Sequence, residues 1–446
     1  MYYFALSATT NKTKKLGETK MKTTGKLTRL FAMVILAAML VLIFASCGKS
    51  DRVVLSYEAP NGKTYTLSEA EYAFLMKYRK YEIFSSYGYP SAWDTDQFWN
   101  SDAGDNRTLD ATVTESVLET AKSIVIERYL MDEYGLALEN NEETKKSMDK
   151  AAENVKKAVS NLGGTGAFRR YWGYMPEELI NYNNLILQSS MVSDHLYGHS
   201  HDNHHVEGVT PITDEDLNKY YTENYKQYLM ILINTKEDIA KDDDGNIQYV
   251  CYDKNGKEVI VTDISEEYLK EKEYTLGYSY EYKEIKDEDR IEEKKGYSDV
   301  ILQQLKDGAD FKELALKYSD EFLTSYYENG YMVSGDLISD KDAIKAIEKL
   351  EIGDYTEEAI SLQSGKYVYI IKRVELTEKA YTHADEDAEE TEYADIFKNF
   401  KTTVKSHTYS ELIKDYAESI VVNTEIVGKY SMKDTFLSKE ILYTYG

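Results

Sequence analysis

The sequence predicts an α+β protein with a mostly helical N-terminal region, a small antiparallel sheet with its own helices, and a long C-terminal helix. Three observations predict this class. Apolar residues recur at three- and four-residue intervals over much of residues 69–196. Two apolar runs, at 228–235 and 367–376, have the composition of strands, and a further apolar stripe follows residue 393. A chain of 446 residues with 42% hydrophobic content can form two or three domains.

The N-terminus has the organisation of a secretory signal. From Met21, a basic stretch ("KTTGKLTR") precedes an apolar run at 30–44. The motif "FASC" that ends this segment resembles a bacterial lipoprotein lipobox, so we expect residues 1–46 to be removed and Cys47 to carry a lipid anchor. A membrane-spanning helix is the alternative, but a run of about 15 apolar residues is short for a bilayer.

Residues 47–210 predict a helical domain. A strand that turns at Asn61-Gly62 comes first, and Ser68 and Glu71 have the spacing of a capping box for a helix to about residue 84. Further helices are predicted at about 111–134, 142–162 and 177–196. In the helix at 111–134, five apolar residues share one face: Val117, Ala121, Ile124, Val125 and Tyr129.

Residues 211–380 predict a small α+β domain with an antiparallel sheet. A short capped helix leads into the strand at 228–235, and an insert at about 236–295 contains a hairpin that turns at Asn255-Gly256. Helices at 298–306, 310–318 and 340–349 then precede the strand at 367–376.

Residues 381–446 predict an acidic linker followed by a helix. The run "ADEDAEETE" is typical of a solvated linker. The helix at about 393–420 carries an apolar stripe that includes Ile396, Phe400 and Val404. Because this helix follows a complete small domain, we expect its stripe to pack back on the N-terminal helices.

Residues 305–375 carry a family resemblance. The stretch "LKDGADFKELALKYSDE…ENGYM…LEIGDYTEEAISLQSGKYVYIIKRVE" looks like a parvulin (PpiC-type) peptidyl-prolyl isomerase domain, with Gly308 and Gly365 at their expected places. Without its signal, the whole chain resembles the PrsA/SurA-type extracytoplasmic foldases. The resemblance implies a SurA N-terminal-like chaperone domain at 47–210, a parvulin-like domain at 211–380, and a C-terminal helix that returns to the first domain.

The resemblance also implies where a site would lie. Parvulins hold the prolyl amide between two strand histidines, an acidic or cysteine residue, and walls of Met and Phe. In this sequence the histidine positions are occupied by Met230 and Tyr369, the acidic position falls on Glu321 or Asp320, and the walls fall on Met332 and on Ala343 or Ile344.

The replacement of both histidines affects the expected isomerase activity. The barrier to prolyl isomerisation is amide resonance, about 18–20 kcal/mol, so catalysis needs a pocket for the twisted amide, and we expect no cofactor. A tyrosine can donate a hydrogen bond where a histidine did, but losing both histidines leaves little of the family's network. We therefore expect a lipid-anchored chaperone or foldase with weak or no isomerase activity; an active isomerase is the alternative.

The charge and cysteine content of the sequence limit the classes of molecule that the protein is expected to bind. Without residues 1–46, which carry a charge of +6, the net charge of the chain is −32, and this argues against nucleic acid and anionic lipid as partners of the folded part. We expect unfolded or nascent secreted polypeptides instead, at the extracytoplasmic face of the cytoplasmic membrane. After Cys47 the only cysteine is Cys251, so no intramolecular disulfide is possible, a habit typical of Gram-positive bacteria. No phosphate loop, nucleophile elbow or HExxH motif indicates another chemistry.

A histidine-rich segment gives a second alternative, a metal-binding lipoprotein. The segment "GHSHDNHHVEG" combines imidazoles and carboxylates, which suit zinc or nickel, although a solvated loop has the same composition. The candidate ligands are His199, His201, His204 and His205.

Overall fold

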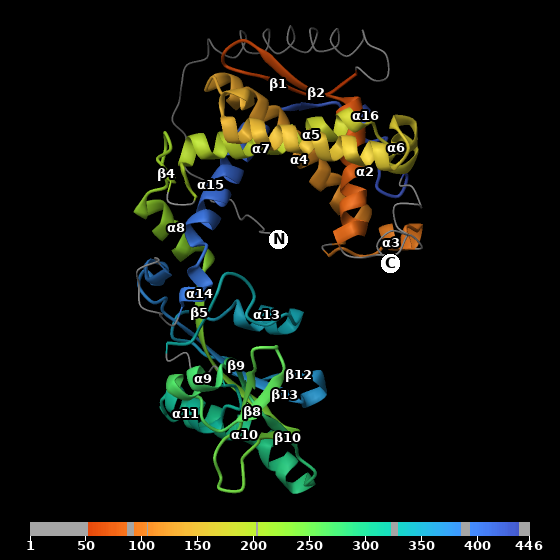
Figure 1. Cartoon of the computed structure of the whole chain (residues 1–446). Coiled ribbons are helices and arrows are strands. Elements are labelled where there is room, and N and C mark those ends of the chain that lie inside the picture. Colours follow the sequence, from red (N-terminus) through yellow and green to blue (C-terminus); the bar gives the residue numbers. More distant parts are fainter. Residues whose placement is uncertain are drawn as a thin grey trace. The chain divides into compact units, whose positions relative to one another are not determined.

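The computed structural model describes residues 52–86, 93–104, 106–201, 204–322, 329–384 and 393–436. They divide into two compact units, one formed by Thr213–Lys401 and one by the residues before Thr213 together with those from Thr402 onwards. We call these the sheet unit and the helical unit (Figure 1). The structure is mixed α+β with several small antiparallel sheets, which confirms the predicted class. No helix among the described residues has the length and apolar character needed to span a membrane.

The helical unit combines one small sheet with a set of helices. Its sheet has the antiparallel order β14-β1-β2, so a C-terminal strand completes an N-terminal hairpin. The elements are β1 (Val53–Glu58), β2 (Thr64–Ser68), α2 (Glu69–Ser86), α3 (Asp96–Trp99), α4 (Leu109–Glu133), η2 (Leu138–Asn140), α5 (Glu142–Asn161), α6 (Thr165–Trp172), α7 (Pro176–Tyr197), β3 (His199–His201), β4 (His204–Val206), β14 (Val421–Val422) and α16 (Thr424–Val427).

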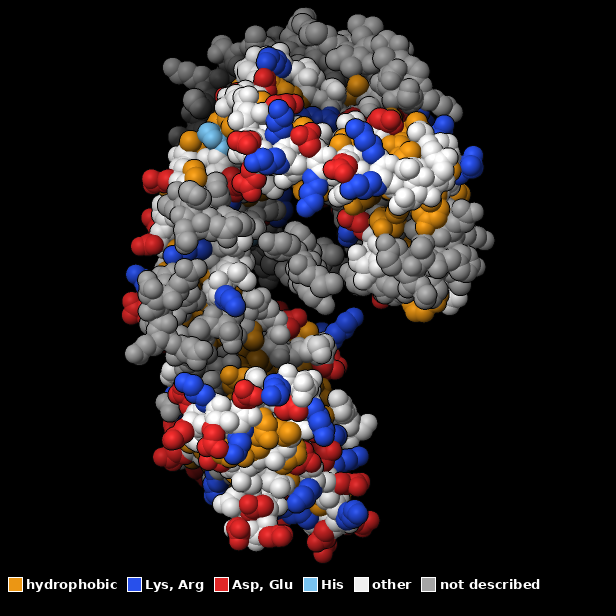
Figure 2. Space-filling model, in the orientation of Figure 1, with side chains coloured by type: hydrophobic (Ala, Val, Ile, Leu, Met, Phe, Trp, Pro, Cys, Tyr) orange, Lys and Arg blue, Asp and Glu red, His pale blue; other side chains and the backbone are white. Residues whose placement is uncertain are grey.

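Local sequence signals start and orient these helices. The backbone N–H of Ser68 donates to Glu71 Oε2 at 2.8 Å and that of Glu71 to Ser68 Oγ at 3.3 Å, which confirms the capping box that begins α2. All five residues predicted for the apolar face of α4 are buried. On α5, acidic and basic side chains alternate, with ion pairs such as Lys146–Glu142, and Figure 2 shows both signs interspersed there. The exposed face of α5 is therefore a solvated one.

The C-terminal helix is shorter than predicted and broken. The structure has α14 (Ala394–Phe397) and then α15 (Phe400–Ala417), and the division between the units falls within α15, after Lys401. Inside the helical unit, Ile413 and Ala417 of α15 belong to the same apolar core as α2, α4 and α7. The hydroxyl of Tyr409 also donates to Glu127 Oε1 of α4 at 3.0 Å.

The sheet unit is built on a four-stranded antiparallel sheet with the order β11-β5-β13-β12. Strands β5 and β13 pair along eight residues, from Tyr367 opposite Asn234 to Val374 opposite Gln227. The elements are α8 (Asp214–Asn224), β5 (Lys226–Asn234), β6 (Glu237–Ile239), β7 (Tyr249–Tyr252), β8 (Glu258–Val261), α9 (Glu266–Lys272), β9 (Thr275–Tyr280), β10 (Tyr282–Glu284), α10 (Glu288–Lys306), α11 (Phe311–Tyr318), β11 (Tyr331–Val333), α13 (Lys341–Ile347), β12 (Ile360–Leu362), η3 (Gln363–Gly365), β13 (Tyr367–Val374) and η4 (Ala380–Ala384).

The insert contains more strands than predicted, and it ends earlier in the sequence than predicted. The predicted hairpin is present as β7 and β8, with Gly256 at φ 75° in its turn, but β9 adds a third strand, and β6 pairs with β10. The helix predicted from Ser298 begins at Glu288. Its charged first half falls in the segment predicted as part of the insert. Asp287 caps the helix, and Lys294 within it is buried.

Candidate functional site

The two faces of the central sheet differ in what covers them. Cross-strand partners share a face and neighbours along a strand alternate. Leu229, Ile231 and Ile233 of β5 therefore share one face with Val368 and Ile370 of β13. This face packs against α10 and α11, which bury Ile301, Leu302, Leu305, Phe311, Leu314 and Ala315 upon it. This face is therefore buried in the core of the sheet unit.

The opposite face carries the candidate site. Tyr228 and Met230 of β5 form one apolar cluster with Ile371, which lies directly opposite Met230. The cluster is closed by Ala343 and Ile347 of α13 and by Leu350, and Tyr369 packs at its margin. Met230 is only 8% exposed. At the first histidine position of the resemblance, the structure therefore has a packed core side chain.

Tyr369 is half-buried and lies opposite Leu232 of β5. Burial raises the pKa of its phenol, and the nearby charge of Glu321 and the side chain of Tyr367 raise it further. The hydroxyl of Tyr369 thus stays protonated at neutral pH and can donate a hydrogen bond. The structure brings two of the predicted residues together here: Tyr369, on the face that also carries Met230, and Glu321, whose charge acts on the phenol of Tyr369.

Glu321 is held near Tyr369 by the two residues before it. The backbone N–H of Asp320 donates to the carbonyl of Leu232 at 2.7 Å, and Ser319 Oγ accepts from the N–H of Leu232 at 3.1 Å. These bonds attach the end of the "YSDE" motif to β5, at the residue that pairs with Tyr369.

The two acidic candidates have different environments. Asp320 is buried and forms an ion pair with Lys294, Nζ to Oδ2 at 3.0 Å, while its Oδ2 also accepts from the backbone N–H of Asn234 at 2.8 Å. Burial raises the pKa of Asp320, and the charge of Lys294 opposes that rise. Lys294 donates further to the carbonyl of Glu237 and to Asp238. Asp320 is thus engaged in a structural network, which leaves Glu321 as the carboxylate beside the candidate site.

The predicted walls lie in two places. Met332 pairs with Gln227, so it lies on the sheet face opposite Met230, where its sulfur accepts from the hydroxyl of Tyr221 at 3.5 Å. The structure therefore does not bring Met332 to the site. On α13, Ala343 is in the cluster with Met230, whereas Ile344 is half-buried beside it.

Sequence reasoning missed the tyrosines contributed by the insert. The hydroxyl of Tyr282, in β10, donates to the carbonyl of Asp320 at 2.8 Å, and burial together with the charges of Glu321 and Asp320 raises its pKa. Tyr282 therefore adds a protonated phenol close to Glu321. Its signal in the sequence was only a tyrosine-rich stretch, "LGYSYEY", within a segment that we expected to be a charged insert.

The remaining predicted sites are described in part or not at all. Cys47 lies outside the described residues. The candidate metal ligands fall in β3 and β4, a hairpin in which His201 is paired with His204 along the backbone, but their side chains are not among those described. Among the side chains that are described, no group of three or more His, Cys, Asp or Glu is arranged to hold a metal ion.

The arrangement defines what the site can do. It offers one phenol donor, Tyr369, and one carboxylate, Glu321, at the margin of a closed apolar cluster, and the phenol can donate a hydrogen bond to a peptide carbonyl. Neither β5 nor β13 contains a histidine, so the two strands cannot supply the paired imidazoles of the family.

Solved structures of PrsA foldases match this chain over most of its length. PrsA from Bacillus subtilis matches at 16% identity, over 77% of this chain and 98% of that chain, with a TM-score of 0.20. The peptidylprolyl isomerase PrsA from Bacillus cereus matches at 15% identity, over 78% and 99%, with a TM-score of 0.26. The foldase PrsA from Streptococcus pneumoniae matches at 16% identity, over 71% and 89%, with a TM-score of 0.20.

No protein-family model matches the sequence, and no characterised protein matches it by sequence. The solved structures that match the chain at low identity are of PrsA, one of the foldase types that the sequence resembles. Because the TM-scores lie below 0.5, we argue function from the geometry of the sheet and its site.

Proposed function

We propose that this chain is a lipid-anchored chaperone, a foldase in the broad sense, which holds unfolded secreted polypeptides outside the cytoplasmic membrane. In this proposal the sheet unit is a parvulin-like domain that serves mainly as a binding module. The observation that carries the proposal is the burial of Met230, where the family resemblance expects a catalytic histidine, in a cluster closed by Ala343 and Ile347.

The physical reason is that isomerisation is catalysed by differential binding. A catalyst must bind the twisted amide more tightly than the planar one, through hydrogen bonds placed for the twisted state. A thioether packed in a core cluster supplies no such donor. At the margin of this closed cluster, the half-buried phenol ring of Tyr369 can contact hydrophobic side chains of an unfolded chain.

An active isomerase is the alternative that one observation favours. The phenol of Tyr369 lies within electrostatic range of the Glu321 carboxylate, and its raised pKa keeps the donor proton in place. A donor and a carboxylate near one apolar surface could orient a prolyl peptide, in a pocket rebuilt around tyrosine.

The anchor and the location belong to the same proposal. Their support is the signal-like segment before Cys47, which ends in "FASC", and the absence of any cysteine after it except Cys251, which is free and buried. A lipid on Cys47 would keep the chaperone where secreted chains emerge, and a Gram-positive cell envelope fits the cysteine usage.

The direct test is suppression of aggregation. The purified chain without its lipid, residues 48–446, is added to a chemically unfolded client protein as the denaturant is diluted, and light scattering is followed. We expect scattering to fall as the chain approaches equimolar ratio. Scattering that does not change at any ratio would refute the chaperone proposal.

A further inference from the structure

A buried carboxyl group lies where three helices of the helical unit meet. Glu127 of α4 is only 6% exposed. Its Oε1 accepts a hydrogen bond from the hydroxyl of Tyr409 of α15 at 3.0 Å, and its carboxyl group is also hydrogen-bonded to the hydroxyl of Ser189 of α7. One side chain therefore connects the C-terminal helix α15 to both α4 and α7.

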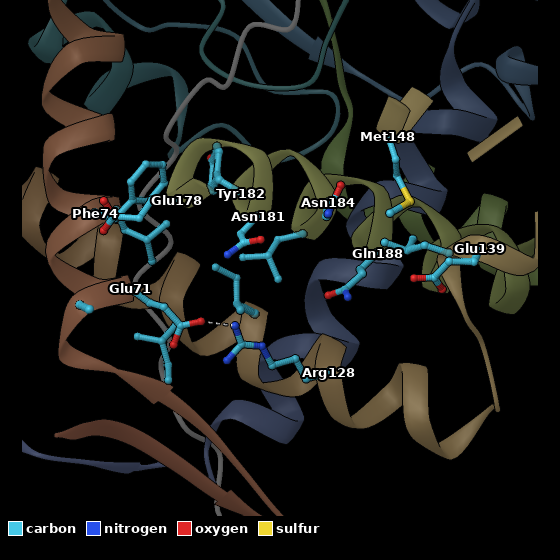
Figure 3. A pocket seen from close by; sticks show the side chains of 16 residues that line it. Glu71, Phe74, Arg128, Glu139, Met148, Glu178, Asn181, Tyr182, Asn184 and Gln188 are labelled. Atoms are coloured by element: carbon cyan, nitrogen blue, oxygen red, sulfur yellow. Dashed lines mark hydrogen bonds and ion pairs between the residues drawn. The ribbon is translucent and has the colours of Figure 1, made fainter. Parts of the chain in front are cut away.

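No positive charge compensates this carboxyl group within the described part of the chain. The group that faces it from α7 is the hydroxyl of Ser189, and the group that faces it from α15 is the phenol of Tyr409. Arg128, the next residue of α4, pairs instead with Glu71 in the wall of a cavity lined by α2, α4, α5 and α7 (Figure 3). A carboxylate buried without a cation is costly, so burial of Glu127 favours its protonated form.

The two hydroxyl partners are compatible with both states of the carboxyl group. A hydroxyl can donate to a carboxylate, and it can also accept from a protonated carboxyl group. Burial and the charge of Glu127 raise the pKa of the Tyr409 phenol, so this phenol stays protonated in both states. Proton uptake by Glu127 therefore removes a buried charge without removing its hydrogen-bond partners.

Helix α15 has few other anchors in the helical unit. Its Lys405 pairs with Asp194 of α7 at 2.5 Å and donates to the carbonyl of Gly198 at 2.6 Å. From residue 402 onwards, the side chains of α15 that are buried are those of Val404, Ile413 and Ala417, and the others are half-buried or exposed. A helix held by few buried side chains can open while the rest of the unit stays folded.

We propose that Glu127 is a pH-sensitive switch, which holds α15 against α4 and α7 when it is protonated and loosens α15 when it is ionised. Opening of α15 exposes the carboxyl group to water, where it ionises at its ordinary pKa of 4.5, whereas burial raises the pKa to about 7 while α15 is docked. Docking is therefore strongest below pH 4.5, weakens as the pH rises to about 7, and changes no further above it.

The position of α15 in the chain gives the switch its consequence. The chain returns from the sheet unit to the helical unit within α15, between Lys401 and Thr402. The switch therefore makes the attachment of this returning segment to the helical unit depend on pH. This inference is independent of the proposed chaperone function, because it concerns contacts within the helical unit alone.

Hydrogen exchange of the full-length protein in detergent tests the switch. Exchange of the amides at 402–417 is measured by mass spectrometry at pH 5 and pH 8 and corrected for the pH dependence of the intrinsic exchange rate. From the two pKa values of Glu127, 4.5 and about 7, we expect the opening equilibrium of α15 to be on the order of 50-fold larger at pH 8. Amides at 113–126 of α4 should exchange more slowly than those of α15 at both pH values, because α15 opens separately.

Three variants assign the response to the carboxyl group. Glu127→Gln keeps the hydrogen-bonding capacity but cannot ionise, so its α15 amides should exchange as slowly at pH 8 as at pH 5. Tyr409→Phe removes a donor to the carboxylate, so the pH at which α15 loosens should move upward. His407→Gln, at an exposed position of α15, is the matched control and should keep the response of the wild type.

Two outcomes would overturn the inference. One is a pH response of α15 that persists at wild-type size in Glu127→Gln, which would assign it to another group. The other is equal exchange of the α15 and α4 amides at both pH values, which would show that α15 opens only when the whole helical unit unfolds.

Discussion

The ammonium group of Lys294 lies 3.0 Å from Oδ2 of Asp320, and only 2% and 11% of the two side chains are exposed. The pair joins α10 to the segment that positions Glu321. Removing one partner of a buried pair leaves an uncompensated charge, so we expect Lys294→Met to lower the free energy of unfolding by about 3–5 kcal/mol. Urea denaturation measures this.

The next residue supplies the control. Lys295 is half-exposed and pairs with Glu292 at the surface, so Lys295→Met should cost less than about 1 kcal/mol. Equal costs for the two variants would show that the buried pair does not hold the "YSDE" segment in place.

Met230 should behave as a core residue. Because it is packed against Ile371 and Ala343, we expect Met230→Ala to destabilise the sheet unit by about 2–5 kcal/mol, measured by chemical denaturation. Leu316→Ala, at a side chain that is 67% exposed, should have an effect within about 0.5 kcal/mol. A small effect at Met230 would indicate an open cleft and would favour the isomerase alternative.

Glu127 should make stability depend on pH. Burial raises the pKa of this carboxyl from 4.5 to about 7, against the hydrogen bonds from Ser189 and Tyr409. Between these values the folded state holds a proton that the unfolded state has lost, so stability falls as pH rises from 4.5 to 7, by up to about 3 kcal/mol.

The variant Glu127→Gln should lack this decline. Denaturation at pH 5 and pH 8 measures it, and Glu119→Gln, at a half-exposed position of the same helix, should keep the pH dependence of the wild type. A Glu127→Gln variant whose stability still falls over this range would assign the dependence to other groups.

Gly330 should resist substitution more than Gly308 does. Both have positive φ, 96° and 91°, but a Cβ at Gly330 would clash with the carbonyl oxygen of Tyr228, whereas one at Gly308 has open space. We expect Gly308→Ala to cost about 1–2 kcal/mol through backbone strain alone, and Gly330→Ala to cost more. Equal losses in thermal unfolding would show that β5 does not constrain the loop before β11.

Short-range patterns predicted much of the fold. The 3.6-residue period identified the buried face of α4, and the spacing of Ser68 and Glu71 identified the start of α2, because both depend on residues within a few turns. The turn at Asn255-Gly256 followed from the backbone freedom of glycine.

Long-range contacts account for what was missed. Helix α6 (Thr165–Trp172) was not predicted, because a short helix without a side-chain N-cap has only a weak local signal. The start of α10 has a local signal, the capping side chain of Asp287, but the burial of Lys294 within the helix depends on Asp320, which is distant in sequence. Met332 faces away from Met230 because Met332 pairs with Gln227 of β5. This strand register could not be predicted from the sequence.

The central claim, that the sheet unit binds polypeptide without efficient isomerisation, is tested most directly by one rate. The cis-to-trans relaxation of a Xaa-Pro tetrapeptide is followed with increasing amounts of residues 48–446. We predict that the relaxation keeps its uncatalysed time of about tens to hundreds of seconds. A clear acceleration by the wild type that Tyr369→Phe or Glu321→Gln abolishes would contradict the claim and identify an isomerase built around tyrosine.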